Sequence, residues 1–305
     1  MQHRDQQTGP KSGKAHGLPG MGRTMLAILI HPSLLTRGLR CIRIILTRFF
    51  LFQYRSALFP RLPVSGVEHP LDNLVPFNPR FIRIYLDFVA FWIRIVGFLS
   101  IGHGKEGKKL AADFIGSITE LYNFAFQIYR KNLSTTNRPN YKKKQFFLVH
   151  LVDPNLMCIP SLHVMLVVHS YTAFRGCLKK LGEEDTGELA KKVYQGALTI
   201  TEAVLYVKQH SVNCIAAALY AMSRFDPALF NIDDAESFIC NLFKGDESAV
   251  PPEYLPHYKI PLVHPENAVK LRNHMSDLYR FFLEKESNDW TLPLLDFLKT
   301  LPSDI

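Results

Sequence analysis

Apolar residues recur at helical spacing through most of this 305-residue chain, and no segment alternates apolar and polar residues over the length of a strand. A chain with this pattern buries its apolar faces by packing helix against helix. We therefore predict an all-α fold, a helical bundle. The expected helices lie near residues 80–99, 109–131, 160–174, 188–223, 233–243, 266–286 and 290–300, with 188–223 forming one long helix or two stacked ones.

Composition narrows the class of protein. Apolar residues make up 47% of the chain and charged residues 21%, which excludes wholesale disorder. The five cysteines are an odd number and form no Cys-x-x-Cys pair, which argues against a disulfide framework and a cysteine-built zinc site. The twelve histidines include no His-Glu-x-x-His, the commonest zinc-protease signature.

The net charge of +9 is distributed unevenly along the chain. Residues 1–61 carry ten basic residues and one acidic residue, whereas residues 226–305 carry seven basic and fourteen acidic residues. The isoelectric point of 9.3 alone would suggest nucleic acid as a partner. The distribution indicates a cationic N-terminal arm instead, so we predict no nucleic-acid partner.

The N-terminal third divides into three segments. Residues 1–24 have little apolar content and are expected to form a disordered basic lead. Residues 25–60 are apolar with arginines and no acid, and the arginines between positions 37 and 55 fall within an arc of about 140° on a helix. This is typical of an amphipathic helix lying in a membrane interface, through which the protein would be membrane-associated, peripheral or partly embedded. A transit peptide or a core-facing helix with a solvated basic face would share the pattern.

A spanning helix is not expected in this segment, because its uncharged stretches fall short of the ~20 residues that a span needs. Residues 61–79 are rich in proline and predict an extended linker. A helical core over 80–225 and an acidic helical C-terminal region over 226–305 follow.

Three short blocks with phosphate-binding chemistry occur in the core. They are Lys131 with Arg138-Pro139, then Pro160-Ser161-Leu162-His163, then Lys208-Gln209-His210 with Cys214 four residues later. A phosphoryl group needs cations on its non-bridging oxygens, and Lys131 and Arg138 supply a point charge and a bidentate fork. Pro160 suits the first turn of a helix, where Ser161 can donate its hydroxyl and the free N–H groups attract an anion.

The two histidines are expected to lie at the same level of the bundle. With a turn over about 178–191, His163 lies about 22 Å and His210 about 28 Å above it on antiparallel helices. This is the arrangement of a general acid and a nucleophile on either side of one phosphorus atom.

In order and spacing, the three blocks resemble the signature of the phosphatidic acid phosphatase type 2 / vanadium haloperoxidase superfamily, over residues 131–222. The phrases IPSLHV and YVKQHSVN look most like its inositol- and sphingolipid-phosphotransferase branch. The resemblance implies that Lys131, Arg138 and Ser161 bind phosphate. It also implies that His163 protonates the leaving oxygen and that His210 forms a phosphohistidine, with no metal and no cofactor. The implied substrate is a phosphate-bearing lipid or a small phosphate ester.

The third block departs from the family pattern at two positions. Val204 stands where the family has an arginine, and Lys208 could supply that charge from nearby. Cys214 stands where the family has the aspartate that orients the nucleophilic histidine, and Asn213 is adjacent to it. Asp153 or Glu202 could substitute for that aspartate.

Three hypotheses follow. The first is a phosphoric ester hydrolase or lipid phosphotransferase. The second is a catalytically decayed protein on the same scaffold that still binds phosphate or membrane. The third is an unrelated helical protein whose basic arm contacts a membrane or nucleic acid.

Overall fold

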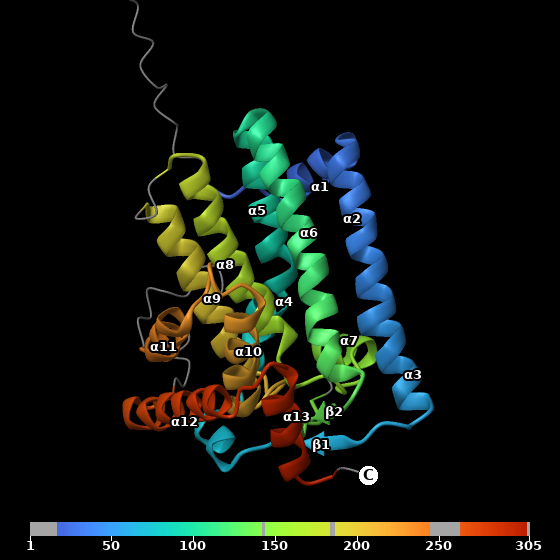
Figure 1. Ribbon diagram of the computed structural model, residues 1–305, viewed down its shortest axis with the longest axis vertical. Helices are drawn as coiled ribbons and strands as arrows, with labels where there is room; N and C mark the ends of the chain where they lie inside the picture. Colours follow the sequence, from blue (N-terminus) through green and yellow to red (C-terminus); the bar gives the residue numbers. More distant parts are fainter. Residues whose placement is uncertain (1–16, 142–143, 184–186, 245–262, 304–305) are drawn as a thin grey trace, which may run out of the picture.

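The computed structural model describes residues 17–141, 144–183, 187–244 and 263–303. It is 73% helix and 3% strand, which confirms the predicted all-α class. The helices form an upright bundle with shorter helices across its lower end (Figure 1). Residues 1–16 of the predicted disordered lead lie outside the described residues, and a helix already begins at Met21.

Five helices form the core of the bundle. They are α5 (Phe88–Gly102), α6 (Gly104–Tyr129), α8 (Leu162–Lys180), α9 (Glu188–Tyr206) and α10 (Val212–Phe225). α5 and α6 form a tight hairpin that reverses at Gly104, whose φ of +57° a residue with a side chain rarely adopts. α10 is the innermost helix, and every residue from Val212 to Ser223 is buried. It packs between α8 and the C-terminal α12 (Pro265–Glu284).

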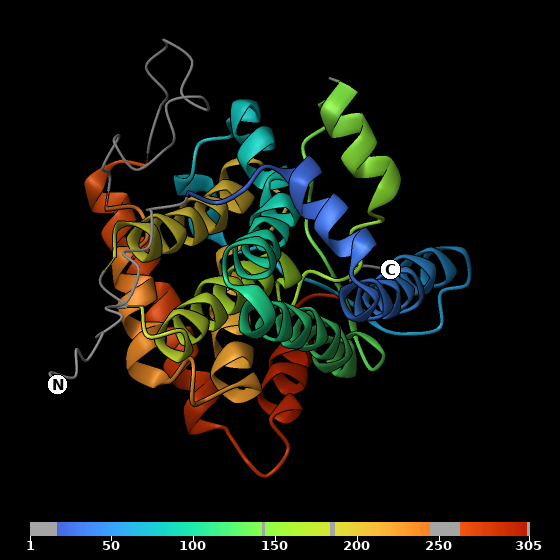
Figure 2. The same cartoon turned by 90° about the horizontal axis from the view of Figure 1, so that it is seen from above.

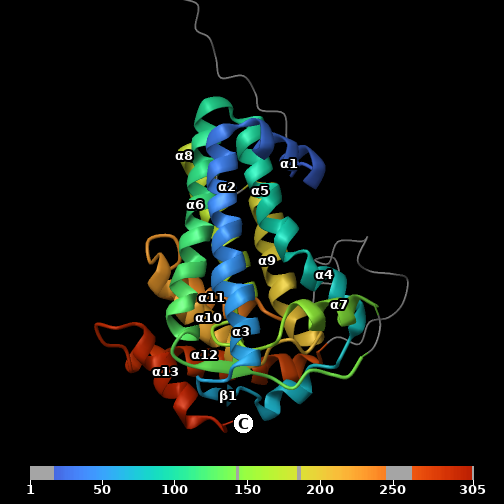
Figure 3. The same ribbon diagram turned by 90° about the vertical axis from the view of Figure 1, so that its right-hand side faces the viewer.

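The N-terminal segment folds back on this core. α1 (Met21–Ile30) crosses α5 at Gly97, where a Cβ atom would lie 2.0 Å from the Thr24 hydroxyl. The chain then turns into α2 (Pro32–Ile44), which continues through the π-helical turn η1 (Ile45–Leu51) into α3 (Phe52–Leu58). This run lies alongside α6 (Figure 3).

The predicted arginine face of this segment is exposed; its members are Arg37, Arg40, Arg43, Arg48 and Arg55. Arg37 and Arg40 form exposed ion pairs with Asp113 and Glu120 of α6. Apolar side chains are exposed on the same helices; on α2, η1 and α3 they are Leu39, Ile42, Leu46, Leu51, Tyr54 and Leu58. α6 thus supplies the carboxylates that the segment itself lacks.

The stretch 188–223 forms two helices. α9 ends at Tyr206, and α10 begins after Ser211, whose hydroxyl accepts a hydrogen bond from the Asn213 backbone. Lys208 lies in the break with φ of +54°. His210 therefore lies in a loop between two helices. The expectation that it lies on a helix is wrong.

The predicted linker is an ordered part of the fold. It contains β1 (Val64–Gly66), the 3-10 turn η2 (Pro70–Leu74) and the start of η3 (Pro79–Phe81), and its Val67 and Val75 are in the core. β1 pairs in parallel with β2 (Leu133–Thr135). Single bridges add Ser303 to β1 and Met157 to β2. These contacts join four distant segments at the lower end of the bundle.

The remaining helices surround that lower end. α4 (Ile82–Leu86) precedes α5, and α7 (Lys144–Val152) follows the segment that carries Arg138 and Pro139. α11 (Ile232–Asn241), α12 and α13 (Thr291–Thr300) form the acidic C-terminal region, which covers one side of the core while the N-terminal helices cover the other (Figure 2).

Among the described residues, the helical run Pro79–Gly102, which comprises η3, α4 and α5, is long and apolar enough to cross a membrane. More than half of its apolar window is buried inside the protein. The pair Met21–Ile30 and Pro32–Leu58 meets the same criterion jointly, with a bend of 108° between its parts.

Candidate active site

His163 and His210 meet at the lower end of the bundle. His163 lies on the first turn of α8, and His210 lies in the break before α10. Nδ1 of His163 lies 3.2 Å from Nε2 of His210, and the side chains are almost fully buried. The prediction that the two rings lie at the same level is met by this contact.

Ser161 connects the beginnings of α8 and α10. It is the N-cap of α8, where its hydroxyl accepts a hydrogen bond from the Val164 backbone at 3.5 Å. Its own backbone N–H donates to the carbonyl of Cys214 on α10. A serine hydroxyl that accepts one bond still has a proton to donate. Pro160 precedes this cap, so α8 begins two residues later than the sequence predicts.

Arg138 and Asp153 form a buried ion pair beside the histidines. Nη1 and Nη2 of Arg138 donate to the backbone carbonyl and to Oδ2 of Asp153, both at 2.8 Å. Burial by itself would raise the pKa of Asp153, but Arg138 outweighs it and holds this pKa below the ordinary value. Nε of Arg138 is buried and has no hydrogen-bond partner.

Burial keeps both histidines neutral at physiological pH. It lowers the pKa of His163 to about 4, although Asp153 acts in the opposite direction. Burial and the neighbouring His163 hold the pKa of His210 well below its usual range. Nδ1 of His210 makes no hydrogen bond of normal geometry, but the backbone of Cys158 lies close enough to favour the protonated ring. The backbone carbonyl of Cys158 is the group best placed to favour a proton on Nδ1 of His210, which leaves the Nε2 lone pair of that ring facing His163.

Two aromatic rings enclose His163 from the other side. The ring centroids of Tyr85 and Phe88 lie 4.6 Å and 4.3 Å from that of His163. Tyr85 is buried near Asp153 and Arg138, and burial raises its pKa strongly. Sequence reasoning missed both rings, because they lie at the junction of α4 and α5, outside every motif.

Lys131 and Lys208 point away from the histidines. The Lys131 ammonium donates to the Thr291 hydroxyl at 3.1 Å and lies 3.8 Å from the carboxylate of Asp289. The Lys208 ammonium donates to the backbone carbonyls of Asp72 and Val75. The prediction that these two lysines join Arg138 at the phosphate is corrected, since each is held by groups of another segment.

The proposed orienting residues have other roles. Sγ of Cys214 accepts a hydrogen bond from the Ser211 backbone and thereby caps α10. The Asn213 amide is shared between the Val67 carbonyl and His274.

The substitutes considered for the orienting aspartate do not contact His210. Glu202 accepts a hydrogen bond from the Phe243 backbone, and burial raises its pKa to about 7. Asp153 is at the site but binds Arg138. Val204 is buried within α9.

The first two blocks thus contribute Arg138, Ser161 and His163 to one place, and the third contributes His210. Among the residues that the structure describes, no group of three or more His, Cys, Asp or Glu side chains converges as a metal site would require. No model of a protein family, no curated protein and no solved structure matches this chain.

Proposed function

We propose that this chain is a phosphoric ester hydrolase or phosphotransferase that acts on a lipid phosphate through a phosphohistidine at His210. The observation that carries the proposal is the contact between Nδ1 of His163 and Nε2 of His210 beside the buried Arg138. The resemblance of the three sequence blocks to the phosphatidic acid phosphatase type 2 / vanadium haloperoxidase superfamily supports the same chemistry.

Arg138 marks the place for the phosphate. Its Nη groups are taken by Asp153, but its Nε–H is buried without an acceptor. A buried donor without an acceptor costs about 1–3 kcal/mol, which a phosphate oxygen would recover. The Ser161 hydroxyl and the N-terminal end of α8 offer further donors to the same anion.

The reaction uses the two histidines in turn. The Nε2 lone pair of neutral His210 forms a bond to phosphorus, the ester P–O bond breaks, and the leaving oxygen takes a proton from His163. The negative charge of the bound phosphate raises the pKa of His163, so this ring takes up its proton as substrate binds. Water or an acceptor hydroxyl then attacks phosphorus, returns a proton to His163 and breaks the P–N bond.

Substrate must separate the two rings, because phosphorus cannot enter a contact of 3.2 Å between the nitrogens. The position of His210 in a loop between α9 and α10 allows this movement without bending a helix. We therefore expect bound phosphate to replace the direct contact between the histidines.

Cys214 stands where the resembled family has an orienting aspartate, and this difference affects the expected turnover rate. The Cys158 backbone favours the protonated ring of His210 but carries no net charge, so it stabilises this form less than a carboxylate does. We expect slow turnover for this reason. The alternative, a decayed protein that binds phosphate without turnover, is favoured by Val204 and by the capping role of Cys214.

A lipid substrate is supported by the surface beside the site. α7 connects the Arg138 loop to Asp153, and its Phe147, Leu148 and Leu151 side chains are exposed. The Tyr54 hydroxyl of α3 donates to the Leu151 carbonyl, which joins α7 to the exposed apolar face of α2 and α3. Apolar side chains exposed on neighbouring helices are expected where a protein rests on lipid.

The test is phosphate release in EDTA from phosphatidate in detergent and from an aryl phosphate. The wild type is compared with His210→Ala, His163→Ala and, as a control, His264→Ala, which removes an exposed histidine at the start of α12. We expect turnover in the wild type and the control, no turnover in the other two variants, and an acid-labile phosphoenzyme that His210→Ala lacks.

If the folded wild type binds phosphate but releases none from either substrate, with or without an added lipid hydroxyl acceptor, the decayed alternative holds. Full activity in His210→Ala would contradict both.

A further inference from the structure

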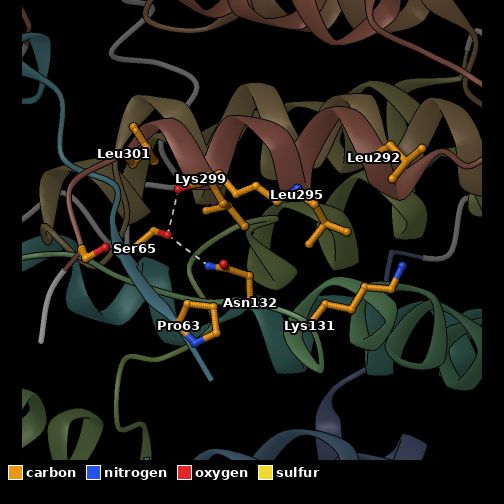
Figure 4. Close-up of a pocket in the computed structure, with 10 residues that line it drawn as sticks. Pro63, Ser65, Lys131, Asn132, Leu292, Leu295, Lys299 and Leu301 are labelled. Carbon is orange, nitrogen blue, oxygen red and sulfur yellow. Dashed lines mark hydrogen bonds between the residues drawn. The ribbon is translucent and has the colours of Figure 1, made fainter. Parts of the chain in front are cut away.

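A cavity of about 450 Å³ lies between α13 and the segments that carry β1 and the end of α6 (Figure 4). Its size is within the range of small-molecule sites. It is separate from the histidine pair, and its wall includes Lys131, the motif lysine that the proposed reaction leaves unused.

Three leucines form one wall. Leu292, Leu295 and Leu298 follow each other at steps of three, so they share a face of α13 over about 9 Å. Leu292 is 41% exposed, whereas Leu298 is fully buried. The accessible part of this wall is therefore formed by Leu292 and, below it, the edge of Leu295, while Leu298 closes the inner end of the cavity.

The polar groups on the opposite side are already satisfied. The Ser65 hydroxyl donates to the Leu298 carbonyl at 2.9 Å and accepts from the Asn132 amide at 3.0 Å. The same amide donates to the Leu133 carbonyl. An apolar ligand can lie against these groups without depriving them of a partner.

Lys131 lies at the Leu292 end of the cavity (Figure 4). Its side chain is 40% exposed, and it makes one hydrogen bond, to Thr291, and a long ion pair with Asp289. An ammonium has three protons, so Lys131 retains donor capacity toward the cavity. A single cation partly neutralised by Asp289 suits a carboxylate better than a doubly charged phosphate.

We propose that this cavity binds a medium-chain fatty acid, with its carboxylate at Lys131 and its acyl chain against Leu292 and Leu295 of α13. The proposal does not depend on catalysis at the histidines.

The test is photolabelling of the full-length chain with decanoate that carries a diazirine at its far end, followed by peptide mapping. We expect the label on residues 291–303. Lys131→Gln should reduce it about fivefold, the upper range for one partly exposed ion pair. Arg130→Gln, which removes an exposed cation one position away and outside the cavity, should leave it unchanged. Asp289→Asn should increase labelling, because it removes the competing charge and keeps an oxygen for the Thr291 backbone.

Decanol with the same diazirine lacks the carboxylate and should label residues 291–303 weakly. Circular dichroism confirms that each variant is folded. Equal labelling of Lys131→Gln and Arg130→Gln would overturn the proposal. Label spread over the exposed apolar residues of α1 to α3, without preference for α13, would overturn it as well.

Discussion

Arg138 and Asp153 illustrate how much a site depends on a few buried side chains. The pair is mostly buried, with the side chains 11% and 16% exposed, and both Asp153 oxygens accept hydrogen bonds. Removing one charge of a buried pair leaves the other without compensation.

We expect Asp153→Asn to lower the free energy of unfolding by about 3–5 kcal/mol, the usual cost of breaking a buried ion pair from one side. Asp113→Asn, which breaks an exposed pair with Arg37, should cost less than about 1 kcal/mol. Urea denaturation of both variants measures the difference. Equal losses of unfolding free energy in Asp153→Asn and Asp113→Asn would show that Arg138 is not desolvated.

Cys214 offers a direct test of the missing orienting residue. An aspartate there would accept the Ser211 hydrogen bond that Cys214 accepts now and would bring a carboxylate near His210. We expect Cys214→Asp to raise kcat in phosphate release, whereas Cys214→Ser, which keeps the cap without a charge, should not. A Cys214→Asp enzyme no faster than Cys214→Ser would remove the orienting role from this position.

The buried histidines also set how stability depends on pH. His163 and His169 have pKa values of about 4 in the folded chain, against 6.5 for an unburied histidine. Between these values the unfolded chain binds more protons, so stability falls as pH falls from about 6.5 toward 4. Melting temperatures over this range should show the loss. His163→Gln should weaken the dependence, and an unchanged slope would count against a buried neutral His163.

Sequence reasoning singled out His163 and His210 through the order and spacing of the three blocks, although the helical rise used to place them applies only to His163, since His210 lies in the break before α10. It misplaced Lys131 and Lys208 because long side chains follow local backbone geometry, such as the positive φ of Lys208, that no pattern encodes. Tyr85 and Phe88 were missed since they reach the site only through tertiary packing.

At the scale of elements, the long helices were predictable and the short connections were not. Helical periodicity marked the positions of α5, α6, α8 and α9. β1 and β2 are three residues long, too short for alternation to register. The break before α10 depends on the Ser211 cap, which lies inside a continuously helical pattern.

α7 is the element whose exposed face can be tested by itself. Replacing Phe147 and Leu151 with serine removes exposed apolar surface beside the site. We expect a several-fold loss of activity on phosphatidate and no change on an aryl phosphate, which needs no lipid contact. Ile101→Ser, an exposed apolar position at the far end of α5, is the control. Equal loss on both substrates would indicate damage to the site.

At the scale of the whole molecule, charge and apolar surface coincide. The exposed arginines of residues 17–67 stand on the same helices as the exposed leucines and isoleucines, and this stretch contains no acid. The described part of the predicted basic arm, from residue 17 on, therefore packs on the folded body, a result that composition alone could not provide.

This coincidence predicts binding to anionic vesicles that weakens as salt is raised. Arg43→Gln with Arg55→Gln should cost about 2 kcal/mol, or roughly thirtyfold in affinity. Lys270→Gln, an exposed position on α12, should have no effect. Cosedimentation with vesicles provides the measurement. Binding that is indifferent to salt and to these arginines would leave only the apolar contribution.

The small β1–β2 sheet has a consequence for how the chain acquires its site. It holds together segments as distant as Ser65 and Leu298, which are 233 residues apart in sequence and joined by a hydrogen bond. Closing such a large loop is slow compared with forming a helix. The loop that leads into His163 is bridged to β2 through Ser134 and Met157, so fixing this loop needs only a short closure that does not involve Leu298. During synthesis the two histidines can therefore meet before α13 has been made, whereas the hydrogen bond between Ser65 and Leu298 has to wait for it.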